Sequence, residues 1–171
     1  SQEILIRDLL ERTNVSPDSV SYIETHGTGT HIGDPIEIGA LKTIFGNRAD
    51  DNPLFIGSVK SNIGHLSAAA GVASVIKNIL MLENEELFPQ LHFNTPNPEI
   101  PWDGFNIKIS KELSKLPRRG DEIITGVSSF GLSGTNAHIL LQKIKKPNKD
   151  ENNKYFKVKK PIFLTLSAKD F

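Results

Sequence analysis

Three segments of the sequence combine polar side chains with glycines, and each directly follows a run of residues typical of a β-strand. They are His26–Thr30 (HGTGT), Lys60–His65 (KSNIGH) and Phe130–Asn136 (FGLSGTN). In α/β proteins, ligands usually bind where the chain leaves the carboxyl ends of the strands. Glycines there let a substrate approach the backbone, and imidazole or hydroxyl groups can orient it by hydrogen bonds. These three segments are therefore the candidates for a functional site.

Two histidines and one lysine in these segments could do chemistry, but each histidine also has a structural interpretation. His26 could donate a hydrogen bond at an active site, or it could cap backbone groups of its loop. His65 could donate to a developing oxyanion, or it could satisfy free N–H groups of the helix predicted to follow it. Lys60 follows an apolar strand and is expected to be partly buried, and a buried lysine needs a partner or a chemical role.

The glycine-rich segment from Phe130 to Ala137 (FGLSGTNA) also leaves alternatives open. It lacks the lysine and the spacing of a phosphate-binding P-loop. Its backbone N–H groups could form an oxyanion hole, or its glycines could serve an ordinary β-turn.

No metal site is predicted. The possible ligands do not have the short spacings seen in zinc sites. They are His26, His31, Asp34 and His65. We interpret His92 and His138 as structural residues.

The composition excludes several classes of function. Among 171 residues, 20 are Lys or Arg and 20 are Asp or Glu, so the formal net charge is zero. This balance argues against a broad nucleic-acid-binding face. No apolar run is long enough to span a bilayer, and no N-terminal leader is visible, so we expect no membrane partner and a cytoplasmic location. The chain has no cysteine, which excludes disulfides, thiolate metal ligands and a cysteine nucleophile of its own.

The elements that must position the three segments alternate between strand and helix. Strands are predicted over residues 20–25, 54–59, 105–109, 123–128 and 138–143. Helices are predicted over residues 2–13, 34–45 and 67–82. The second helix is expected to begin with Asp34 as N-cap, Pro35 at the first helical position and Glu37 at the third. The third is apolar on nearly every side, which is typical of a helix buried in a core. Alternation ending in two adjacent strands predicts an α/β fold with a mixed sheet.

Taken together, the motifs resemble those of one protein family. HGTGTHIGDPIE (residues 26–37), VKSNIGH (59–65) and SSFGLSGTNAHIL (128–140) occur in an order and at a spacing similar to those of ketosynthase domains of modular polyketide synthases. The resemblance covers about residues 2–143. It divides the chain into a C-terminal portion of a ketosynthase domain (1–144), a charged connector (145–160) and the start of the linker subdomain that follows these ketosynthases (161–171).

The resemblance implies the C-terminal part of a thiolase-like fold with α-β-α-β-α layers. It implies a decarboxylative Claisen condensation, in which a cysteine-bound acyl chain reacts with a malonyl-type extender on an acyl carrier protein. No bound cofactor is implied, since the substrates travel on the phosphopantetheine of the carrier protein. The cysteine would come from an N-terminal ketosynthase portion, so this chain would be inactive alone. Complete ketosynthases of this kind are usually homodimers and serve pathways such as antibiotic biosynthesis.

The resemblance also implies roles by position. His26 and His65 match the histidines that support decarboxylation and stabilise the enolate oxygen, and Lys60 matches the lysine that organises hydrogen bonds around the second histidine. Leu132 matches the gatekeeper whose backbone N–H would join that of the cysteine to form an oxyanion hole. Phe130 is assigned to the same oxyanion-hole and gatekeeper group. Further residues expected to support the active site are Thr28, Thr30 and Asn62.

Two departures favour the polyketide type over fatty-acid-synthase relatives. Leu132 stands where those relatives commonly have phenylalanine, and Ser74 stands where they tend to have an acid. A rival hypothesis is a non-catalytic scaffold or docking fragment, in which the motifs only maintain the fold.

Overall fold

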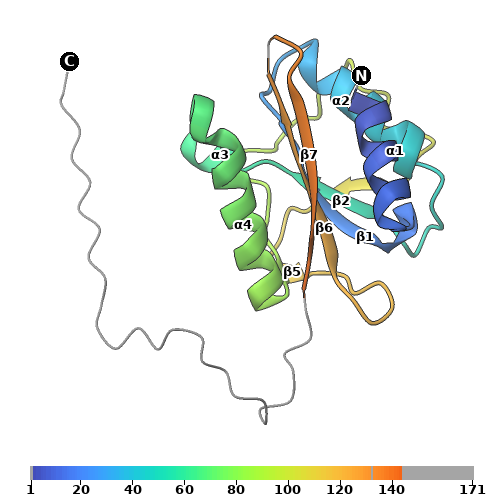
Figure 1. Cartoon of the computed structure of the whole chain (residues 1–171). Coiled ribbons are helices and arrows are strands. Elements are labelled where there is room, and N and C mark those ends of the chain that lie inside the picture. Colours follow the sequence, from blue (N-terminus) through green and yellow to red (C-terminus); the bar gives the residue numbers. More distant parts are fainter. Residues whose placement is uncertain (1, 132, 144–171) are drawn as a thin grey trace, which may run out of the picture.

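A five-stranded mixed sheet forms the centre of the computed structural model, which describes residues 2–131 and 133–143 (Figure 1). The strands are β1 (Val20–Glu24), β2 (Leu54–Gly57), β4 (Ile107–Ile109), β6 (Ile124–Phe130) and β7 (Asn136–Gln142), in the spatial order β4-β2-β1-β6-β7. The first four are parallel, and β7 runs antiparallel to β6. The α/β class and the mixed sheet are therefore confirmed. A separate pair, β3 (Glu86–Leu87) and β5 (Ser114–Lys115), was not predicted.

Helices cover both faces of the sheet (Figure 1). On one face lie α1 (Gln2–Thr13) and α2 (Gly33–Phe45), and on the other lie α3 (Lys60–Ile63) and α4 (Ala70–Asn84). Short 3-10 turns occupy Pro17–Ser19 and Ser67–Ala69. The core beneath α1 and α2 includes Ile6, Leu10, Ile38, Leu41 and Phe45, packed on Val20, Ile23 and Leu54 of the strands. The smaller core beneath α4 consists of Tyr22, Met81, Leu82, Leu87, Leu116 and Ile123.

Several predicted boundaries are wrong in ways that concern the three motifs. Strand β2 ends at Gly57, and Lys60–Ile63 forms a helical turn. Strand β6 continues to Phe130 and β7 begins at Asn136, so the glycine-rich connection is shorter than expected. Hydrogen bonds between facing strands extended both elements into the motif. Leu132 and the predicted segments 145–160 and 161–171 lie outside the described residues.

The predicted start of the second helix is also wrong. Helix α2 begins at Gly33, and its N-cap residue, Ile32, makes no side-chain capping bond. The carboxylate of Asp34 instead accepts the backbone N–H of Gly29 at 3.1 Å. The acids of the GDPIE sequence therefore bind the preceding loop rather than the helix terminus.

Helix α4 is buried on only one side, contrary to the expectation. Ser74, Asn78 and Met81 face the sheet and are buried, and the Asn78 amide satisfies the Ser74 carbonyl at 3.0 Å. The opposite side leaves four aliphatic residues 42 to 62 % exposed: Val72, Ile76, Ile79 and Leu80. The sheet can cover only one side of a helix, and these side chains lie partly exposed on the side that it leaves uncovered. No helix in the described part of the chain is long and apolar enough to cross a membrane.

This apolar face should make the isolated chain self-associate, because exposed apolar clusters of this kind drive association. We expect the double substitution Ile76→Lys/Ile79→Lys to raise the monomeric fraction measured by size-exclusion chromatography. Ile4→Lys is the control, since Ile4 is more exposed, at 68 %, than either substituted residue but lies on α1 away from this face. A wild-type chain that runs as a stable monomer would contradict the expectation.

Candidate functional site

The HGTGT loop is anchored by the side chain of Glu37. Both carboxylate oxygens of Glu37 accept backbone N–H groups, from His26 at 2.8 Å and from Gly27 at 3.0 Å. At the far end of the loop, the hydroxyl of Thr30 accepts the N–H of Gly33 at 3.0 Å. The hydroxyl of Thr28 lies 3.5 Å from that of Thr30. Buried Glu37 therefore fixes the backbone at His26 and Gly27, and Thr30 fixes the far end of the loop at Gly33.

Burial raises the pKa of Glu37 from 4.5 to about 7, although its two backbone hydrogen bonds and Lys60 oppose the shift. A carboxyl with a raised pKa binds its proton more tightly in the folded than in the unfolded state. The free energy of unfolding should therefore fall as pH rises from about 4.5 to about 7, with this residue contributing about 3 kcal/mol over the window.

The substitution Glu37→Gln should remove this part of the pH dependence, because an amide does not titrate in the window. The measurement is the urea midpoint of the complete ketosynthase at pH 5 and pH 7.5, for wild type and variant. Glu99→Gln in an exposed loop is the control and should follow the wild type. An identical pH dependence in wild type and Glu37→Gln would show that folding does not raise the pKa of the Glu37 carboxyl.

His26, His65 and Phe130 come together from the three motifs. The ring centroids of His26 and His65 are 5.5 Å apart with the planes at 84°, and those of His26 and Phe130 are 5.9 Å apart at 61°. Phe130 ends β6, so its position depends on the unpredicted extension of that strand. The edge-on arrangement lets the two imidazoles face a common space without stacking on one another.

The surroundings of His26 favour its neutral form. Burial, followed by the nearby positive charge of Lys60 and by His65, lowers the pKa of His26 to about 4. Its Nδ1 atom is buried and has no hydrogen-bond partner within residues 2–131 and 133–143. A neutral imidazole carries one N–H donor and one acceptor, so at neutral pH His26 can donate a hydrogen bond without carrying a positive charge.

The tautomer of His65 follows from a hydrogen bond to its Nδ1 atom. Its Nδ1 atom accepts the backbone N–H of Ser67 at 3.0 Å. When the ring is neutral, its proton must then lie on Nε2, because a nitrogen that accepts a hydrogen bond is unprotonated. The 3-10 turn at Ser67–Ala69 therefore presents the Nε2–H of His65 as a donor.

Lys60 is half-buried at the start of α3, as the sequence predicted. Burial lowers its pKa, and the negative charges of Glu24 and Glu37 oppose that shift. Asn62 lies on the exposed side of the same turn, where its side-chain oxygen accepts the Ser61 hydroxyl at 3.2 Å. Lys60 is thus close enough to the HGTGT loop to act electrostatically on His26, whereas the Asn62 side chain contacts its own turn.

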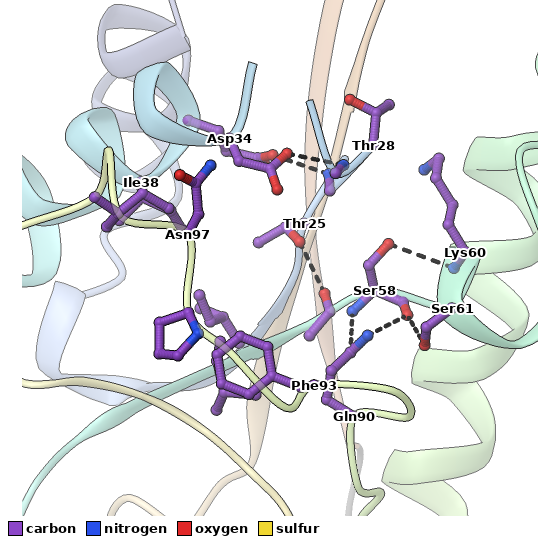
Figure 2. A pocket seen from close by; sticks show the side chains of 18 of the residues that line it. Thr25, Thr28, Asp34, Ile38, Ser58, Lys60, Ser61, Gln90, Phe93 and Asn97 are labelled. Carbon is purple, nitrogen blue, oxygen red and sulfur yellow. Dashed lines mark hydrogen bonds between the residues drawn. The ribbon is translucent and has the colours of Figure 1, made fainter. Parts of the chain in front are cut away.

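A cavity of about 590 Å³ is lined by Gly27 and Thr28 of the HGTGT loop and by Lys60, whereas His26 and His65 themselves do not line it. Figure 2 shows Lys60 and Ser61 on one side, Asp34 and Ile38 on the other, and Gln90 with Phe93 closing the base. The chain from 90 to 102, which carries no strand or helix, therefore contributes to the site alongside the motifs.

Sequence reasoning missed Gln90. Its side-chain oxygen accepts the N–H of Ser58 at 2.7 Å, and its amide donates to the Ser58 carbonyl at 3.3 Å (Figure 2). The prolines around this residue restrict the backbone, but they do not indicate which groups the loop contacts. Gln90 thereby satisfies both backbone groups of Ser58, as a neighbouring strand would, and fixes the backbone two residues before Lys60.

Of the remaining histidines, His31 and His92 line the cavity, whereas His138 does not. His138 is buried in β7, where its Nδ1 lies 3.0 Å from the Ser128 hydroxyl and burial lowers its pKa to about 4. His92 lies in the 90–102 loop with a left-handed φ of 58°. Within the described ranges, no three His, Cys, Asp or Glu residues are grouped so that they could hold a metal ion.

Comparisons with known proteins point to one family. Residues 1–94 match the beta-ketoacyl synthase C-terminal domain, and residues 96–171 match the ketoacyl-synthetase C-terminal extension. The chain is 44% identical over 171 residues to erythronolide synthase EryA3 of Saccharopolyspora erythraea, covering 99% of the chain and 5% of that protein. It is 50% identical over 133 residues to probable polyketide synthase 17 of Dictyostelium discoideum, covering 77% of the chain and 5% of that protein.

Solved structures show the same similarity. The ketosynthase from module 6 of the bacillaene synthase of Bacillus subtilis 168 aligns with a TM-score of 0.79 and 46% identity, over 84% of this chain and 26% of that one. Ketosynthase twelve of the bacillaene synthase of Bacillus amyloliquefaciens aligns with a TM-score of 0.78 and 42% identity, over 84% and 26%. The chain thus spans about a quarter of these ketosynthases and a twentieth of the large curated relatives.

Proposed function

Since this chain belongs to the β-ketoacyl synthase family, as the C-terminal portion of a polyketide synthase ketosynthase, we propose that it supplies the decarboxylation machinery of an elongating enzyme. Its α/β fold is the C-terminal part of the thiolase-like fold of its structural neighbours. The reaction is a decarboxylative Claisen condensation between a cysteine-bound acyl chain and a malonyl-type extender on an acyl carrier protein. An N-terminal ketosynthase portion supplies the cysteine, and this chain alone is inactive.

The observation that carries the proposal is the edge-on pair of His26 and His65. When the malonyl carboxylate leaves as carbon dioxide, the C–C bond electrons pass into the thioester and create an enolate. Its oxygen becomes negative, and neutral N–H donors placed beforehand stabilise that charge. The low pKa of His26 and the Nδ1 contact of His65 make both rings suitable donors in their neutral forms.

The second step forms the new carbon–carbon bond. The enolate carbon attacks the acyl thioester on the cysteine, and the C–S bond breaks to release the thiolate. Lys60 supplies positive charge near the developing anion. Phe130 restricts the His26 ring, Thr28 and Thr30 hold its loop, and Leu132 would contribute a backbone N–H to an oxyanion hole.

The proposed partners follow from the same assignment. The exposed aliphatic face of α4 fits the apolar surface of the N-terminal ketosynthase portion, since covering it removes a hydrophobic cluster from water. The other partners are the acyl carrier protein, whose phosphopantetheine brings both substrates, and a second ketosynthase in a homodimer. The proposed location is the cytoplasm, and the proposal includes no bound cofactor.

The experiment that tests this function is native mass spectrometry after co-expression with the cysteine-bearing portion, followed by addition of an acyl-carrier-protein thioester. A stoichiometric complex that gains an acyl group on the cysteine and then condenses it with a malonyl extender would support the proposal. A chain that is stable alone and forms no complex would favour the non-catalytic scaffold instead.

A further inference from the structure

A buried ionic cluster lies beneath α4, outside the three motifs. Glu24 is the last residue of β1 and is fully buried, and Tyr22 beside it is 1 % exposed. The ammonium group of Lys77, on α4, lies 2.7 Å from one Glu24 carboxylate oxygen and 2.9 Å from the Tyr22 hydroxyl. The same carboxylate oxygen accepts the Tyr22 hydroxyl at 2.5 Å. A buried carboxylate is tolerated only with such partners, because removing its charge from water is costly.

The second carboxylate oxygen of Glu24 has a different hydrogen-bond partner. It accepts the backbone N–H of Val59, the residue directly before Lys60. Glu24 itself lies two residues before His26 in the sequence. One buried side chain therefore joins the strand that leads into the HGTGT loop to the segment that leads into KSNIGH.

The backbone hydrogen bonds between β1 and β2 end just before Val59. The last paired residues of β1 and β2 are Glu24 and Gly57, and Thr25 adds a final backbone bond to the Gly57 carbonyl at 2.8 Å. Beyond it, Ser58 is held by Gln90 from the cavity side. The Val59 N–H, on the α4 side, is held by Glu24.

We propose that Glu24, held in place by Lys77 and Tyr22, is a positioning residue that sets Lys60 and His65 relative to His26. The inference rests on the proposed function, since it concerns the geometry of the decarboxylation site. Glu24 contacts no reacting atom in this proposal. It acts through the Val59 N–H, and the ion pair with α4 keeps its carboxylate from rotating away.

Two double variants of the complete ketosynthase separate positioning from mere stability. Glu24→Gln/Lys77→Met removes both charges but keeps a side-chain oxygen that can accept the Val59 N–H. Glu24→Leu/Lys77→Met removes the charges and the acceptor. Neither leaves an unpaired buried charge, and exchanging a buried ion pair for uncharged residues is often tolerated.

Each variant is measured in two partial reactions, namely acyl transfer to the cysteine and decarboxylation of malonyl-carrier protein. Acyl transfer does not need the histidine pair and so reports the amount of folded enzyme. The Leu/Met variant is expected to lose about tenfold or more in decarboxylation relative to acyl transfer, because small misplacements of catalytic groups have effects of this size. The Gln/Met variant should keep most of the wild-type ratio.

The outcomes are distinct. If the ratio of decarboxylation to acyl transfer is the same in the two double variants, whether normal or reduced in both, Glu24 has no positioning role. A wild-type enzyme that acylates but neither decarboxylates nor condenses would contradict the proposed function itself. A loss confined to the Leu/Met variant would establish the Glu24–Val59 contact as the element that aligns the two histidine segments.

Discussion

Replacing His26 or His65 with alanine in the complete ketosynthase should lower malonyl decarboxylation by about 10²–10³-fold, the usual effect of losing one preorganised donor to a developing oxyanion. Condensation should fall with it, because the enolate is its nucleophile. Acyl transfer to the cysteine should remain, since no enolate forms in that step. The measurement is single-turnover release of carbon dioxide beside a parallel assay of cysteine acylation.

Two conservative variants of His65 test which nitrogen matters. His65→Asn keeps an acceptor near the position of Nδ1, where the ring accepts the Ser67 N–H, but it has no donor at the position of Nε2. His65→Gln can place an amide N–H nearer to Nε2. The Gln variant should therefore retain more decarboxylation than the Asn variant. Full turnover by either alanine variant would refute the assigned roles of the histidines.

The sequence was most informative where a signal is local. Runs of β-branched and apolar residues predicted the five main strands, and glycine with polar residues marked their carboxyl ends. Parallel pairing of β1, β2 and β6 then placed His26, Lys60 and Phe130 at one edge of the sheet, as the general position of ligand sites in such sheets leads one to expect.

Contacts between distant residues were not predictable in the same way. Lys77 and Glu24 are separated by 53 positions, and a lysine within an apolar helix carries no sign of its partner. Glu37 fitted the pattern of a helix start, yet a carboxylate can accept any backbone N–H within reach, and Glu37 accepts those of His26 and Gly27 in the loop. Which side of α4 this chain covers was also not predictable, because apolar residues on every side of a helix do not distinguish the side packed on its own sheet from the side left exposed.

Gly27 provides a second large effect, because a side chain there has no room. Its φ is +46°, and an added Cβ would lie 2.7 Å from the Ser58 Cβ and 2.7 Å from the Thr25 hydroxyl oxygen. The substitution Gly27→Ala therefore combines backbone strain with overpacking, and we expect it to lower the free energy of unfolding by about 2–5 kcal/mol. The measurement is chemical denaturation of the complete ketosynthase.

Gly29→Ala is the matched control in the same loop. Gly29 also has a left-handed φ, +73°, but an added Cβ would meet no atom within 4 Å. Gly29→Ala should therefore lower the free energy of unfolding only through backbone strain, by about 1 kcal/mol. Equal destabilisation by the two substitutions would mean that φ alone requires the glycines. A larger effect at Gly27 would mean that this glycine sets how closely the HGTGT loop approaches Ser58, and hence the separation of the segments that carry His26 and His65.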